Sequence, residues 1–226
     1  MFIPFIFAGA LLCLLPFYVW TEYHWSQEKF FFLKLACSLL FLATAISALF
    51  FYVDDPANKT YAIMIIAALG FGLIGDCFLV FPEKLKYFII GLASFLVGQI
   101  IYGINFMMIL GVSWIDALVY AAIIGLIVWL FKIGKMEFGK MKKPVIAYVV
   151  AITFMITLAL SGLYKTGLSP LLTVMVAASA VLFLASDVLL GFMRFAPVQH
   201  KCYRATNLVL YYIAQLIFAL TIVFVG

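Results

Sequence analysis

Charged side chains are scarce in this sequence: they make up 10% of its 226 residues, whereas 68% of the residues are hydrophobic. Soluble domains usually contain about 25% charged and about 45–50% apolar residues. The shortage excludes a soluble globular enzyme, a disordered chain, a coiled coil and a nucleic-acid-binding module. Because a helix that crosses a membrane needs about 20 mostly apolar residues, the composition predicts an all-α, polytopic membrane protein with very short connections.

Metal-binding side chains are also scarce. The two histidines, His24 and His200, both fall in expected loops, and the four cysteines form no Cys-x-x-Cys pair. A catalytic zinc site needs about three protein ligands, and disulfide frameworks and structural zinc sites have characteristic cysteine spacings. We therefore expect no metal, no cofactor and no Ser-His-Asp hydrolase site.

Eight long apolar runs divide the chain. They cover residues 2–20, 30–52, 60–81, 87–110, 114–131, 144–163, 168–193 and 205–225. Because lipid cannot satisfy backbone N–H and C=O groups, each run must form its hydrogen bonds within itself, as a helix does. The first run has no basic residues before it, so we interpret it as a true span and not as a cleaved signal. We predict one integral membrane domain over residues 1–226 with eight transmembrane helices.

Lysine and arginine are distributed unevenly between the two predicted ends of the helices. Lys59 and Lys165 fall on the side that holds both termini, and the other twelve basic residues fall on the side that holds the connections after the first, third, fifth and seventh spans. Cytoplasmic loops carry an excess of lysine and arginine. We therefore expect a multi-pass protein of the cell membrane, with both termini outside and the basic loops in the cytoplasm.

Two carboxylates lie well inside the predicted spans, Asp76 in the third and Asp187 in the seventh. Each is roughly 9–10 Å from the expected cytoplasmic end of its helix, at about 1.5 Å per residue. Such a charge costs about 2.5–3.5 kcal/mol on insertion scales. Capping of a neighbouring helix or a hydrogen bond to a tyrosine is the structural alternative. The matched depth favours Asp76 and Asp187 as a catalytic pair.

The two aspartates also have matching neighbours. Each follows a small residue, precedes a leucine by three positions and precedes a phenylalanine, Phe81 or Phe192, by five. This match suggests a duplication of four-helix halves. Halves with an even number of spans have the same orientation, so we expect a parallel repeat.

Further polar residues lie on one face of a helix in the fourth and eighth spans. Asn207, Tyr211 and Gln215 follow one another at intervals of four residues, and Gln99 and Tyr102 are three apart. Residues three or four apart are neighbours on a helix, so we consider all five as substrate-binding candidates. Hydrogen bonds that hold helices together are the alternative.

Basic residues near the expected cytoplasmic surface are candidates for holding a phosphate. Lys34 lies about one turn inside the second span, and Arg194 ends the seventh. Lys34 could instead extend its ammonium group to the membrane surface. The Gly-x-Gly-x-x-Gly segment at residues 70–75 is excluded as a dinucleotide site, because that motif binds only between a strand and a helix.

Taken together, these motifs resemble the YhhN family of eight-span membrane proteins, which includes the TMEM86-type lysoplasmalogenases. The resemblance covers nearly the whole chain and rests on Lys34, Gly75-Asp76 with Leu79, Gly91 through Phe95, Tyr102, Leu182-Phe183, Ser186-Asp187, Arg194-Phe195, Tyr211-Tyr212 and Ala214-Gln215. The chain departs from the family pattern twice. Lys34 is followed by Leu35 where the family often has proline, and Gln99 stands where the family often has histidine, so Gln99 cannot carry a proton.

The resemblance implies an ether hydrolase that cleaves the vinyl ether bond of a lysoplasmalogen to a fatty aldehyde and a glycerophospho-ethanolamine or -choline. The expected partner is a lysophospholipid in the membrane, and the residues carry no signal for head-group preference or oligomeric state. One buried carboxyl group could supply the acid and the other the base. A transporter or proton-coupled carrier could use the same aspartates, and an aspartyl intramembrane protease is a weaker alternative, because the Gly-x-Gly-Asp pattern is incomplete.

Overall fold

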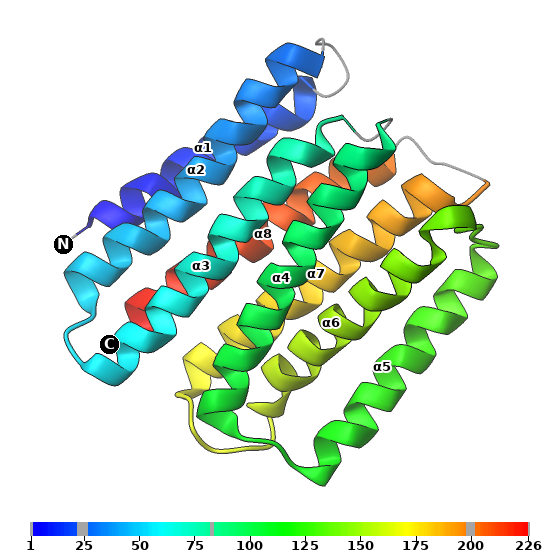
Figure 1. Ribbon diagram of the computed structural model, residues 1–226. Helices are drawn as coiled ribbons and strands as arrows, with labels where there is room; N and C mark the ends of the chain where they lie inside the picture. The colour runs from blue at the N-terminus through cyan, green and yellow to red at the C-terminus, as the bar shows by residue number, and fades with distance from the viewer. Residues whose placement is uncertain (1, 22–26, 82–83, 198–201, 226) are drawn as a thin grey trace.

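The protein, seen in a computed structural model, is described over residues 2–21, 27–81, 84–197 and 202–225, which contain helices and no strand (Figure 1). The helices are α1 (Ile3–Thr21), α2 (Gln27–Tyr52), α3 (Pro56–Leu79), α4 (Leu85–Leu110), α5 (Trp114–Ile133), the short 3₁₀ helix η1 (Gly139–Met141), α6 (Lys142–Ser161), α7 (Pro170–Phe195) and α8 (Cys202–Val225). Eight of them are long and apolar enough to cross a membrane, which confirms the predicted fold class. His24, His200 and Lys201 lie outside the described residues.

The connection between α3 and α4, the connection between α5 and α6 and the C-terminal end of α7 lie together at one end of the bundle (Figure 1). We call this the basic end, because it holds most of the described lysines and arginines: Lys84, Lys86, Lys132, Lys135, Lys140, Lys142, Lys143 and Arg194. Lys59 and Lys165 lie toward the opposite end.

Polar caps, and not the limits of the apolar runs, determine where two helices begin. α3 begins at Pro56, because the Asp55 carboxylate accepts hydrogen bonds from the backbone N–H groups of Ala57 and Asn58. α7 begins at Pro170, after the cap residue Ser169. Such caps satisfy N–H groups that the first turn of a helix leaves unpaired.

The helix contacts of the first half recur in the second half. α1 packs on α2, α2 on α3 and α3 on α4, and in the same order α5 packs on α6, α6 on α7 and α7 on α8. The halves meet through α2 with α8 and through the corresponding pair, α6 with α4, and in addition α1 and α3 contact α8. The shared packing order agrees with the predicted parallel four-helix repeat, which would make α3 with Asp76 correspond to α7 with Asp187.

Helix α5 lies at the edge of the bundle and packs mainly on α6 (Figure 1). Of its most apolar stretch 11% is buried, compared with 61% for the stretch that includes α6. Its first turn is fastened to the α6–α7 connection, where Lys165 Nζ lies 2.7 Å from Asp116 Oδ2 and the Tyr164 hydroxyl donates to Asp116 Oδ1. The helix is therefore pinned at its start and makes few contacts along the rest of its length.

Glycines let α3 approach α4 and α8 closely. A Cβ atom on Gly72 would lie 2.6 Å from Gln215 Nε2, and one on Gly75 would lie 2.6 Å from the Phe95 ring. Both glycines belong to the segment at residues 70–75, which lies inside α3 and not between a strand and a helix. Close approach of this kind is what small residues provide in membrane helices.

Candidate functional site

Asp76 lies toward the basic end of α3, in a cluster of side chains from α2, α3 and α8. Its Oδ1 is 3.3 Å from Lys34 Nζ, and its Oδ2 accepts hydrogen bonds from Ser38 Oγ (2.6 Å) and the Tyr211 hydroxyl (2.8 Å). The Tyr212 hydroxyl lies 3.2 Å from Ser38 Oγ. All five residues are buried. The Asp76 carboxylate is thus compensated by one cation and two donors.

The Asp76 cluster continues as a chain of hydrogen bonds toward the middle of the bundle. Gln215 Nε2 donates to the Tyr211 hydroxyl at 3.2 Å, and the Tyr102 hydroxyl donates to Gln215 Oε1 at 3.1 Å. Tyr102 comes from α4 and the other two residues from α8. The structure therefore joins several residues singled out in the sequence: Lys34, Asp76, Tyr102, Tyr211 and Gln215.

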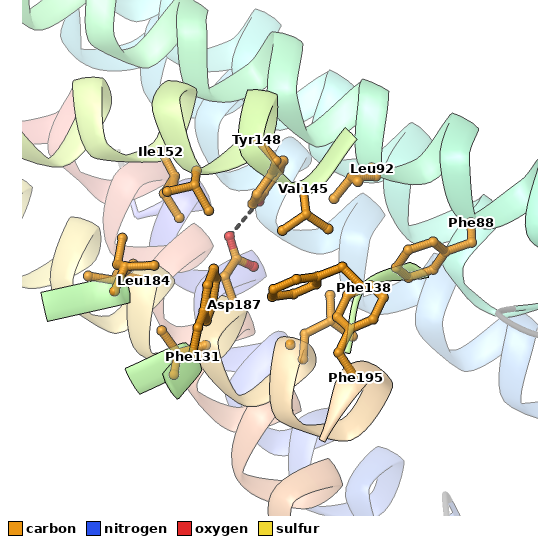
Figure 2. Close-up of a pocket in the computed structure, with 15 residues that line it drawn as sticks. Phe88, Leu92, Phe131, Phe138, Val145, Tyr148, Ile152, Leu184, Asp187 and Phe195 are labelled. Carbon is orange, nitrogen blue, oxygen red and sulfur yellow. Dashed lines mark hydrogen bonds between the residues drawn. The ribbon is translucent and has the colours of Figure 1, made fainter. Parts of the chain in front are cut away.

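Asp187 lies in a different environment, a pocket lined mainly by apolar side chains of α4, α5, α6 and α7 (Figure 2). Tyr148 on α6 donates a hydrogen bond to Asp187 Oδ2. These two residues are the polar members of the lining. Neither ion pair formed within the described ranges includes Asp187, so its carboxyl group has one donor and no cation.

The lining of the pocket changes along the bundle. Toward the basic end it includes three aromatic rings, those of Phe88, Phe138 and Phe195, besides smaller side chains. There the Arg194 guanidinium lies 5.0 Å from the centroid of the Phe88 ring. Aliphatic side chains line the inner part of the pocket: Leu184, Ile152 and Ile127. Each lies about one helical turn further from the basic end than the lining residue of the same helix, which is Asp187, Tyr148 or Phe131 respectively. We call the part toward the basic end, where Arg194 lies next to Phe88, the rim, and the inner aliphatic part the floor. Asp187 lies between them.

The sequence of the chain matches the model of a known protein family. The model of the YhhN family matches residues 29–222. The chain belongs to the YhhN family. This family includes TMEM86-like lysoplasmalogenases. Comparisons with curated proteins and with solved structures gave no significant match.

The residues that carry the YhhN resemblance fall into both regions, and the two aspartates have separate partners. No hydrogen bond joins Asp76 to Asp187 in the part of the chain that the structure describes. Aromatic packing connects the regions. The Tyr211 ring packs edge-on against Phe95 and Phe183, with centroid separations of 5.7 and 5.6 Å. Phe183 precedes Asp187 by one turn of α7.

Three other candidates from the sequence lie outside the Asp76 cluster. Gln99 is buried beside Tyr148, and its Oε1 has no hydrogen-bond partner among the described residues. Asn207 Nδ2 donates to the backbone oxygen and hydroxyl of Ser186 at 2.7 and 2.9 Å. It therefore ties α8 to α7, which is the alternative to substrate binding given above. Arg194 lies at the pocket rim.

Sequence reasoning missed Ser38 and Tyr148 as partners of the aspartates, and Tyr212 as a partner of Ser38. Ser38 follows Lys34 by four residues on α2, a spacing that places both side chains on one face and could have indicated it. Tyr148 stands alone in an apolar run. Only the packing of α6 on α7 brings its hydroxyl to Asp187.

Proposed function

We propose that this protein is a hydrolase of the lysoplasmalogenase type, which cleaves the vinyl ether bond of a lysoplasmenyl-ethanolamine or -choline. Membership of the YhhN family supports an enzyme of the hydrolase class. The observation that carries the proposal is the Asp187 carboxyl group, which has one hydrogen-bond donor and no cation among the described residues and lies in a pocket that, Tyr148 apart, is apolar.

The aliphatic, carboxyl and cationic parts of the pocket follow one another in the same order as the alkenyl chain, the vinyl ether and the phosphate of such a lipid. The aliphatic floor suits the alkenyl chain, and the rim with Arg194 suits the phosphate. Between them the vinyl ether would lie at the level of Asp187. Lys84 and Lys86 at the same end of the bundle supply further positive charge for the head group. Charge-assisted hydrogen bonds to a phosphate are about twice as strong as neutral ones.

The proposed reaction needs a proton donor at the vinyl ether and no cofactor. Asp187 delivers its proton to the outer vinyl carbon, and the substrate becomes an oxocarbenium ion. A water adds to the carbon bonded to oxygen, and its proton returns to the Asp187 carboxylate. The resulting hemiacetal then releases a fatty aldehyde as its hydroxyl proton moves to the departing glycerol oxygen. General acid catalysis of this kind contributes about 10²–10⁴-fold to a rate.

Asp76 takes a supporting part in this proposal. It is paired with Lys34 and is not among the residues that line the pocket. Its hydrogen bond from the Tyr211 hydroxyl orients the ring that packs on Phe183, one turn from Asp187. We therefore assign Asp76 as a positioning residue, and the acid–base pairing of the two aspartates stays a prediction from the sequence.

Aldehyde release from a lysoplasmalogen by the purified protein in nanodiscs tests the proposal. The matched control is a lysolipid of equal chain length with a saturated ether, which has no alkene to protonate and should not be cleaved. Release from the vinyl ether alone is the expected result. No release from either lipid would refute the proposed activity.

We also propose that the basic end faces the cytoplasm, because the described basic residues gather there. Single cysteines at Asn58 and Lys140, in a chain whose own cysteines have been replaced, should react with an impermeant maleimide from opposite sides of the membrane. Asn58→Cys should react in intact cells and Lys140→Cys after permeabilisation. Labelling of both from one side would contradict the topology.

A proton-coupled carrier is the second candidate, and the length of the buried polar column favours it. Beyond Tyr102, the Tyr61 hydroxyl donates to Thr221 Oγ1 at 2.8 Å, and Asn105 Nδ2 donates to the Tyr61 backbone oxygen at 3.1 Å. From Asp76 to Tyr61, α3 rises by roughly 22 Å, at about 1.5 Å per residue. The apolar core of a bilayer is about 30 Å thick.

Proton flux into proteoliposomes, followed with an internal pH dye, tests this second candidate. Tyr211→Phe removes a hydroxyl that links Asp76 to Gln215. Flux above that of protein-free liposomes, lost in this variant, would favour a carrier. Flux equal to that of protein-free liposomes would exclude one.

A further inference from the structure

We infer that the Asp187 pocket is a binding site for an organic cation carried on an alkyl chain. The Asp187 carboxyl group carries the negative charge once its proton has left, and the rings of Phe131 and Phe138 lie beside it in Figure 2. The aliphatic floor supplies the surface for the chain. The existence of this site rests on the pocket itself, and its part in the reaction rests on the proposed function.

The aromatic rings of the pocket are inclined to one another and are not stacked. The centroids of Phe131 and Phe138 are 5.0 Å apart with planes at 61°, and those of Phe138 and Phe195 are 5.0 Å apart at 59°. Rings inclined in this way turn their faces and edges in different directions around the pocket. A cation within about 6 Å of a ring face is attracted by the electrons of the ring, and the attraction is strongest away from water.

Charge complementarity supports a cation as the occupant. Tyr148 donates to one oxygen of Asp187, and no ion pair within the described ranges involves the carboxyl group. Arg194 already places a cation 5.0 Å from the Phe88 centroid at the rim. The rim therefore accommodates one cation against an aromatic ring, and the interior has both the rings and the carboxyl group to accommodate another.

This site would be complementary to the high-energy state of the proposed reaction. When Asp187 gives up its proton it becomes an anion, at the moment when the ether carbon becomes a cation. The carboxylate and the aromatic rings attract that cation but gain nothing comparable from the neutral substrate. Interactions that are stronger in the transition state than in the ground state are the ones that raise a rate.

Binding of dodecyltrimethylammonium to the purified protein in nanodiscs tests the site without any turnover. The matched neutral probe is the hydrocarbon in which carbon replaces nitrogen. We expect the ammonium probe to bind more tightly and to raise the unfolding temperature more. Glycerophosphocholine, which carries an ammonium group but no alkyl chain, should not compete. Equal binding of the charged and neutral probes would overturn the inference, as would competition by glycerophosphocholine, which would point to a head-group site.

Variants of the two rings separate an aromatic effect from simple filling of space. Phe131→Leu and Phe138→Leu should each weaken ammonium binding about three- to thirtyfold and leave binding of the neutral probe unchanged. Phe131→Tyr keeps a ring and should retain binding, and Phe50→Leu is the control at an exposed position on α2. Asp187→Asn should abolish the preference for the charged probe. Equal losses for both probes in the leucine variants would overturn the inference.

Failure of this site and failure of the proposed function give different results. A preference for the ammonium probe that depends on Phe131 and Asp187, without aldehyde release, would leave the cation site standing and refute the hydrolase. Aldehyde release without any such preference would keep the hydrolase and refute the cation site. If both hold, the ammonium probe should inhibit aldehyde release competitively, and the neutral probe should inhibit it more weakly.

Discussion

Asp76 on α3 and Asp187 on α7 would be equivalent in the predicted repeat, yet the structure surrounds them differently. Asp76 is buried against Lys34, Ser38 and Tyr211. Asp187 faces an apolar pocket and keeps one hydrogen bond, from Tyr148. A buried charge is costly unless it is paired and hydrogen-bonded. The comparison therefore teaches that the neighbouring helices compensate the charge of Asp76 with a cation and donors, whereas the described residues give Asp187 a single donor.

The largest expected effect separates the two aspartates by activity. Asp187→Asn should lower aldehyde release per folded molecule by about 10²–10⁴-fold, because an amide has no carboxylic proton to deliver. Asp76→Asn should lower it far less. The measurement is the rate with a lysoplasmenyl-ethanolamine in nanodiscs, normalised to the folded fraction.

The control for this comparison is Asp54→Asn, at an exposed position between α2 and α3, which should behave as the wild type. A chelator should leave all activities unchanged. Equal losses for Asp76→Asn and Asp187→Asn, with both variants folded, would contradict the division of roles. That result would restore the two aspartates as an acid–base pair.

The next effect concerns stability in the Asp76 cluster. Lys34→Met leaves the Asp76 carboxylate without its cation, and removing one partner of a buried ion pair costs about 3–5 kcal/mol of unfolding free energy. The double variant Lys34→Met/Asp76→Asn should regain most of that loss, because neither charge is then left unpaired. Denaturant unfolding of the wild type, the two single variants and the double variant measures the coupling free energy between Lys34 and Asp76. Unchanged stability together with a KM raised about tenfold would instead assign Lys34 to phosphate binding.

A smaller effect is expected in the Asp187 pocket. Tyr148→Phe removes the donor to Asp187 while the ring keeps its place in the pocket wall. Losing a hydrogen bond to a charged group costs about 1.5–3 kcal/mol, so kcat should fall by at least about tenfold and its pH profile should move. Tyr120→Phe is the matched control, because the Tyr120 hydroxyl makes an exposed contact from α5 to the Val150 backbone oxygen on α6, at 3.5 Å. A pH profile identical to that of the wild type would remove Tyr148 from the site.

The smallest effect tests the helix contact beside Asp187. Asn207→Ala removes the hydrogen bonds that tie α8 to Ser186 on α7. The expected result is a loss of about 1 kcal/mol in unfolding free energy, with little change in activity per folded molecule. Loss of activity at unchanged stability would return Asn207 to the substrate-binding residues.

Much of the fold could be predicted from local sequence. Each span is continuous in the chain and must satisfy its own backbone hydrogen bonds in lipid, so eight apolar runs indicated eight helices. Their ends were less certain, because caps such as Asp55 extend a helix beyond its apolar run. The contact between Tyr211 and Gln215 was also within reach, since residues four apart share a helix face.

Hydrogen-bond partners that lie on different helices could not be predicted from local sequence patterns. Nothing near Tyr148 in the chain indicates that it meets Asp187, and nothing near Ser38 indicates that it meets Tyr212. Such contacts depend on which helices are neighbours and on how each helix is rotated about its axis. Small residues such as Gly75 decide how closely two helices approach, and that effect appears only once the facing side chain, here Phe95, is known.

The amino-acid sequence by itself determined the number of helices, the uneven distribution of basic residues and the presence of two carboxyl groups inside apolar spans. These properties follow from composition and from spacing along single helices. Only the tertiary structure decided that Lys34 pairs with Asp76 and that no cation faces Asp187 within the described residues. The physical reason is that the energy of a buried carboxyl group depends on the charges and donors within a few ångströms of it. In this bundle those groups come from other helices.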